Sequence, residues 1–153
     1  MSEENKALVR RIEEAWDSGD LDALDGLFAP EVLSHANVPW LPPGLAGWKL
    51  AHQNMKAAVP DRLVSIEDMI AEGDLVVVRC RLTGTNRGGL PWAGVGPNDS
   101  RIDMQWISVY RIADGRVVET WAINEMMKLV DQLGAPRELI RARVMRGGWP
   151  VLR

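Results

Sequence analysis

The sequence has little of what marks a secreted, membrane-bound or disulfide-rich protein. It has one cysteine, Cys80, so no disulfide can form within the chain, and the reducing cytoplasm is the expected location. No apolar run approaches the roughly 20 residues that a membrane-spanning helix needs. The acidic, polar residues 2–5 do not resemble a signal peptide. We therefore expect no membrane as a partner.

The motifs of several enzyme classes are also missing. No Gly-x-Ser-x-Gly occurs, which argues against a hydrolase with a nucleophile elbow. The glycines between residues 84 and 96 match neither of the nucleotide-binding fingerprints. The only histidines, His35 and His52, are not accompanied by a carboxylate cluster. We therefore expect no metal and no cofactor.

Charge is unevenly distributed along the chain, which carries −3 in total. The C-terminal segment 137–153 has five arginines and one glutamate, so it carries +4 and the rest of the chain −7. The segment has no lysine-rich run and the body is acidic, so we expect no nucleic-acid partner. An extra basic helix docked on an acidic surface or on a partner subunit is the simpler interpretation.

The first 60 residues show helical periodicity interrupted by turn signals. Apolar residues recur at spacings of three and four, which predicts helices over 2–18, 20–28 and 44–58. Ser2 and Asp20 are suitable N-caps. Residues 31–35 form a short extended piece before a proline-rich loop.

The period then changes to two, which is typical of strands. The predicted strands are 62–71, 75–85, 101–112 and 117–124, and short helices follow over 126–133 and 136–145. Asp114-Gly115 between two alternating runs predicts a hairpin. The 153 residues therefore suit one α+β domain, residues 1–153, with helices packed on the concave face of a curved antiparallel sheet that encloses a pocket.

Several short segments resemble the SnoaL-like polyketide cyclases, a family with the cone-shaped fold of the nuclear-transport-factor-2-like superfamily. They lie in order between about residues 5 and 135: 16–20, 29–35, 59–61, 66–74, 79–85, 110–121 and 132–134. In that family the last strand reads Glu-x-Trp-x-x-x-Asp, and the Asp is the acid–base residue. Here it reads Glu119-Thr-Trp-Ala-Ile-Asn-Glu125, so the resemblance makes Glu125 the candidate. Where the family has Gly-Thr-His, this chain has Asn86 in place of the imidazole.

Alternation along the strands indicates which residues face the pocket. In 101–112 the even positions are the apolar ones, and in 75–83 they include Cys80, which we expect to be unreactive. Arg79 and Arg81 then lie on the opposite face, paired with Asp103 or Gln105. The predicted substrate-binding residues are Trp40, Met55, Trp92, Met104, Trp106, Trp121 and Asn124. For the strand residues an ordinary place in the core is the alternative.

Glu125 is the predicted acid–base residue, with His35 and His52 as helpers. Glu125 lies between Trp121 and two methionines, so we expect it to be desolvated and its pKa to be raised. A surface acid at a helix start is the alternative for Glu125, and a hydrogen-bonded structural role is the alternative for each histidine.

Together with these residues, the resemblance implies a cofactor-independent cyclase or isomerase that closes a ring by an intramolecular aldol step on an apolar, polyketide-like metabolite. Epoxide opening in the same pocket is the second hypothesis, and a non-catalytic small-molecule-binding or scaffold domain is the third. Ile107 and Val109 on the outer sheet face suggest a homodimer.

Overall fold

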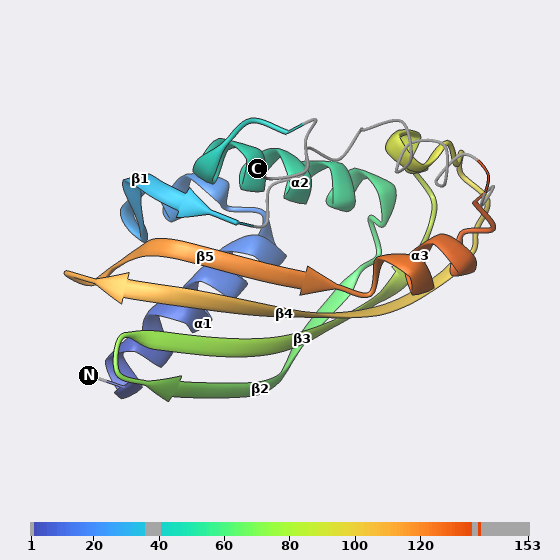
Figure 1. The fold of residues 1–153 in the computed structure, drawn as a ribbon. Helices are drawn as coiled ribbons and strands as arrows, with labels where there is room; N and C mark the ends of the chain where they lie inside the picture. The colour runs from blue at the N-terminus through green and yellow to red at the C-terminus, as the bar shows by residue number, and fades with distance from the viewer. Residues whose placement is uncertain (1, 36–40, 136–137, 139–153) are drawn as a thin grey trace.

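The computed structural model describes residues 2–35, 41–135 and 138, with Trp92 described by its backbone only. The chain forms helices and one five-stranded, curved sheet that does not close into a barrel (Figure 1). In chain order the elements are α1 (Ser2–Ser18), the 3-10 helix η1 (Leu21–Gly26), β1 (Phe28–Ser34), α2 (Gly44–Ala58), β2 (Leu63–Glu72), β3 (Leu75–Thr85), the 3-10 helix η2 (Pro91–Ala93), β4 (Arg101–Ala113), β5 (Arg116–Asn124) and α3 (Met126–Gln132). The predicted α+β class is confirmed.

The strands lie in the order β1-β5-β4-β3-β2. The four strands from β2 to β5 are antiparallel neighbours, as the alternating pattern predicts. The short extended piece forms β1, which pairs in parallel with β5 and makes the sheet mixed. Helix α1 crosses the sheet, and α2 runs above the β1–β5 edge (Figure 1).

Local sequence signals account for most element boundaries. The Asp20 side chain accepts a hydrogen bond from Ala23 N, which caps η1 as expected. Asp114 and Gly115 both have positive φ, 50° and 70°, as a two-residue hairpin turn of the primed type requires. The prediction that the second helix reaches Phe28 is wrong, because the chain turns into β1 there. The helix predicted over 136–145 falls almost wholly outside the described residues.

The two faces of the sheet differ in burial as the strand parity predicts. The even residues of β3 and β4 pack beneath the helices, on what we call the inner face; among them Cys80, Ser108 and Tyr110 are fully buried. The odd residues form the outer face, where Arg81 pairs with Asp103 and Arg79 bonds to Gln105. Both arginine predictions are confirmed.

Strand β5 departs from simple alternation. A β-bulge shifts the register, so that Val117 lies opposite Ile112 but Thr120 lies opposite Tyr110. Beyond the bulge every side chain changes face. Trp121 lies opposite Val109 and is therefore on the outer face, so the prediction that it lines an inner pocket is wrong.

Candidate functional site

Glu125 follows the last residue of β5 and is the N-cap of α3, but its surroundings are not those expected. Its side chain is 41% exposed and accepts hydrogen bonds from Gln105 N at 2.9 Å and from Lys128 Nζ at 3.1 Å. The backbone hydrogen bond from Gln105, followed by Lys128, lowers the pKa of Glu125. The prediction of a desolvated carboxyl group with a raised pKa is wrong. Glu125 is an ionised acid at the rim of the sheet.

His35 belongs to a cluster on the outer face. Its Nε2 lies 2.8 Å from Glu119 Oε1, and its ring stacks on Trp121 with centroids 4.9 Å apart. Arg111 bonds to Glu119 Oε2 at 3.0 Å and lies over the Trp121 ring. The hydrogen bond with His35, together with Arg111, lowers the pKa of Glu119. We call these four residues the outer cluster.

His52 lies in a third place, within the aromatic layer formed by α1 and α2. Its ring stacks on Trp16 at 3.8 Å between centroids, and Trp16 in turn stacks on Trp48 at 5.8 Å. Burial, with a smaller effect of Arg62, lowers the pKa of His52 to about 3. The ring is thus neutral at physiological pH. The three residues predicted to act together occupy three different surroundings.

The other predicted binding residues divide between core and rim. Met104 is buried, and the half-buried Met55 packs on the same hydrophobic cluster. Trp106 is half-buried and contacts both hydrophobic clusters of the molecule. Asn124 lies opposite Trp106 on the inner face and is exposed. Trp92 lies in η2, and Trp40 falls outside the described residues.

The inner face holds a buried carboxyl group that the sequence reading did not select. Glu13, on α1, is 5% exposed, and its Oε1 accepts a hydrogen bond of 2.9 Å from the Tyr110 hydroxyl. Desolvation raises the pKa of Glu13 to about 7, against the opposing effects of Tyr110 and the Cys80 thiol. The same burial raises the pKa values of Tyr110 and Cys80, so Cys80 is unreactive as expected.

Two hydroxyl groups on the same face are buried without a hydrogen-bond partner. They are Ser108 Oγ, on a residue with no exposed surface, and Thr120 Oγ1, on a residue 1% exposed. Ser108 also lies near enough to the Tyr110 hydroxyl to oppose the rise in its pKa, but without the geometry of a hydrogen bond. Buried polar groups in proteins are almost always paired, so unpaired ones call for an explanation.

The sequence contained a signal for Glu13. It lies four residues after Val9 and three before Trp16, on the apolar stripe of α1. An acid within such a stripe is expected to be buried and paired. No sequence signal shows that Ser108 and Thr120 lack partners, because that depends on the three-dimensional packing around them.

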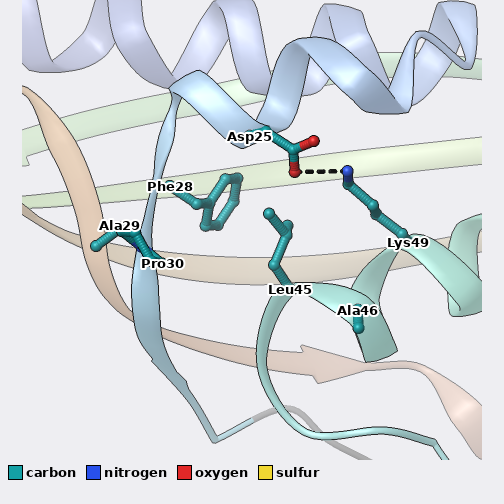
Figure 2. Close-up of a pocket in the computed structure, with 7 residues that line it drawn as sticks. All are labelled: Asp25, Phe28, Ala29, Pro30, Leu45, Ala46 and Lys49. Atoms are coloured by element: carbon teal, nitrogen blue, oxygen red, sulfur yellow. Dashed lines mark hydrogen bonds and ion pairs between the residues drawn. The ribbon is translucent and has the colours of Figure 1, made fainter.

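The described residues form two pockets, and neither is lined by Glu13, Ser108 or Thr120. One, of about 370 Å³, lies between η1, β1 and α2, and the ion pair between Lys49 and Asp25 spans it at 2.6 Å (Figure 2). The other, of about 690 Å³, lies between α1 and the turns that join β2 to β3 and β4 to β5. Neither is lined by any residue of the predicted site.

A model of the SnoaL-like polyketide cyclase family matches residues 6–133. The chain belongs to this family. A search of curated proteins finds no matching sequence.

Solved structures agree with this membership. IdmH, a proposed polyketide cyclase from Streptomyces antibioticus, is 32% identical, covers 85% of this chain and 98% of its own, and has a TM-score of 0.73. A proposed polyketide cyclase from Bacillus cereus is 29% identical over 86% of this chain and 81% of its own, with a TM-score of 0.75. AclR from Streptomyces galilaeus, described as a proposed hydroxylase, is 27% identical over 88% of this chain and 98% of its own, with a TM-score of 0.76.

The family therefore supports an enzyme with a cyclase or isomerase role. Within the described residues no helix is long and apolar enough to cross a membrane. In the same part of the chain no three His, Cys, Asp or Glu side chains gather as metal ligands would.

Proposed function

We propose that the chain is a cofactor-independent cyclase that closes a ring in an apolar, carbonyl-containing metabolite bound against the inner face. The observation that carries this proposal is the pair of buried, unpartnered hydroxyl groups of Ser108 and Thr120. A hydroxyl group on an otherwise apolar wall can donate to a ligand oxygen, and it costs stability when it has no partner.

The walls around these hydroxyl groups suit an apolar ligand. Trp48 stacks on Trp16 and lies 6.4 Å, between ring centroids, from Tyr110. Trp48 Nε1 also donates to Ser34 Oγ, and Ser34 pairs with Thr120 in the sheet. Large, rigid aromatic walls with a few fixed polar groups are typical of sites that hold a flexible chain in one conformation.

The reaction needs one proton acceptor. A carboxylate removes a proton alpha to a carbonyl group, and the C–H electron pair moves onto the carbonyl oxygen to form an enolate. The enolate carbon attacks a second carbonyl group of the same molecule, and the carboxyl group returns the proton to the new alkoxide. Glu125 stands where the family has its acid–base residue, and Glu13 is the other candidate carboxyl group.

The residues around Glu125 favour cyclisation over epoxide opening. Epoxide opening uses a second carboxylate beside the first. Asp103, which acts electrostatically on Glu125, is instead held by two hydrogen bonds to Arg81 on the outer face. Its pKa is lowered, chiefly by those bonds, so it is a poor proton donor.

A second copy of the chain is the partner that we propose for the outer face. Large apolar side chains are exposed there, among them Ile70, Ile107 and Ile123. Arg79, Arg81 and Arg111 on this face each pair with an acid within it, so it needs no oppositely charged partner. A half-apolar surface on which these arginines are already paired suits a two-fold symmetric contact.

The proposal is tested by binding and by chemistry on one probe, α-tetralone, an apolar aromatic ketone. We expect saturable quenching of tryptophan fluorescence and faster exchange of its alpha protons for deuterium, followed by NMR in D2O. Ser108→Ala combined with Thr120→Val should weaken binding. Exchange no faster than in buffer would refute the proposed reaction.

A further inference from the structure

We propose that Glu13, held by Tyr110, is the group that transfers the proton, and that the hydroxyl groups of Ser108 and Thr120 hold the carbonyl oxygen. This assignment rests on the proposed function and specifies its chemistry. It moves the reacting centre from the rim of the sheet at Glu125 to the middle of the inner face.

The position of Glu13 follows from contacts to two strands. Its carboxyl group bonds to Tyr110, on β4, and interacts with the thiol of Cys80, on β3. Cys80 lies opposite Trp106, two residues along β4 from Ser108. Side chains two residues apart share a face of a strand, so the carboxyl group lies over the part of the inner face that carries Ser108.

Burial on the inner face decreases toward the Asn124 end of β5. Asn124 is exposed, its cross-strand neighbour Trp106 is half-buried, and Cys80 beyond it has no exposed surface. Neighbouring strands lie about 4.8 Å apart, so Cys80, with which Glu13 interacts, lies about two strand spacings from Asn124. In the register of the sheet, Trp106 lies between Asn124 and Cys80.

The chemistry suits this carboxyl group better than the one at the rim. Burial raises the pKa of Glu13 to about 7, so both protonation states are populated near neutral pH. A general base acts best when its pKa lies near the working pH. Glu125 has a lowered pKa and contacts Lys128, so it takes up a proton less readily. The groups that face Glu13 from β3 and β4, Cys80 and Tyr110, remain neutral.

The steps balance without any further reagent. Ionised Glu13 takes the alpha proton of the ketone, and its O–H bond forms as the C–H bond breaks. The enolate oxygen accepts hydrogen bonds from Ser108 and Thr120. The new C–C bond converts the second carbonyl oxygen to an alkoxide, which receives the proton from Glu13 and restores the carboxylate.

The test measures deuterium exchange into α-tetralone by the full-length chain and its variants. We expect Glu13→Gln to lower the enzyme-dependent rate by about a hundredfold or more, with native circular dichroism. The matched control is Glu14→Gln, the same change on the exposed side of α1, which should keep the rate. When the exchange rate is measured against pH, Tyr110→Phe should shift the midpoint of the transition attributed to Glu13.

Infrared titration gives a second readout that needs no substrate. The carbonyl band of a protonated carboxyl group should disappear near pH 7 in the wild type and should be missing in Glu13→Gln. If that variant does not fold, Tyr110→Phe carries the test through a shifted band midpoint. If the Glu13→Gln variant folds and keeps full exchange activity, the assignment is overturned. Loss of exchange activity in Glu125→Gln would then place the proton transfer at the rim. No exchange by the wild type overturns the proposed function instead.

Discussion

A glutamate paired with a ring side chain lies at each face of the sheet, and the pKa values of the two glutamates are shifted in opposite directions. Glu13 bonds to Tyr110 and is 5% exposed, and desolvation raises its pKa. Glu119 bonds to His35 and Arg111, its side chain is 24% exposed, and these partners lower its pKa. The pKa of the inner carboxyl group is set by burial beside neutral partners, and that of the outer one by its hydrogen bonds with His35 and Arg111. Only the inner one is suited to proton transfer near neutral pH.

The largest expected effect is on the pH dependence of stability. The pKa of Glu13 is raised from 4.5 to about 7 on folding, so its contribution is present below pH 4.5 and is lost as the pH rises to about 7. The loss amounts to about 3 kcal/mol at most. Urea unfolding between pH 4 and 8 should show it, and Glu13→Gln should remove it.

His52 complicates this measurement, because its lowered pKa acts with the opposite sign. Its contribution is present above pH 6.5 and is lost as the pH falls toward about 3. The difference between the wild type and Glu13→Gln cancels His52, and Glu14→Gln supplies the control. A difference that does not vary with pH would mean that Glu13 keeps an ordinary pKa, and the contrast between the faces would disappear.

The next effect concerns the outer face. If a second copy covers it, Ile107→Glu places a charge in the contact and should weaken association by about 2 kcal/mol, or roughly thirtyfold in the dissociation constant. Sedimentation equilibrium measures this. Leu50→Glu, the same change at an exposed site on α2, should have no effect. A wild-type chain that remains monomeric at high concentration would refute the dimer.

A smaller effect should separate binding from stability on the inner face. Thr120→Val removes an unpartnered buried hydroxyl group and keeps the side-chain shape, so it should stabilise the fold by about 1 kcal/mol while weakening ketone binding. Thr83→Val on the half-buried outer face should change neither property appreciably. Destabilisation by Thr120→Val would indicate that this hydroxyl group has a partner in the folded protein.

The sequence predicts the sheet faces wherever a strand alternates regularly. It assigns the residues of β3 and β4 to the correct faces, including Arg79 and Arg81 on the outer face. It fails in β5, because a bulge near Val118 moves Trp121 to the other face and nothing in a single sequence marks that bulge. One of the two partners of Glu125 was equally hidden, because it is the backbone N–H group of Gln105, twenty residues away.

The smallest expected effect is that of Glu125→Gln on stability. Glu125 is exposed and its pKa is lowered, so its contribution is present above pH 4.5 and is lost only as the pH falls further. The glutamine oxygen can still accept the hydrogen bond from Gln105 N, and only the contact with Lys128 is lost. The melting temperature at pH 7 should therefore change by no more than about 2 °C. A much larger drop would mean that the rim carboxylate, and not the buried one, is the acid on which this fold depends.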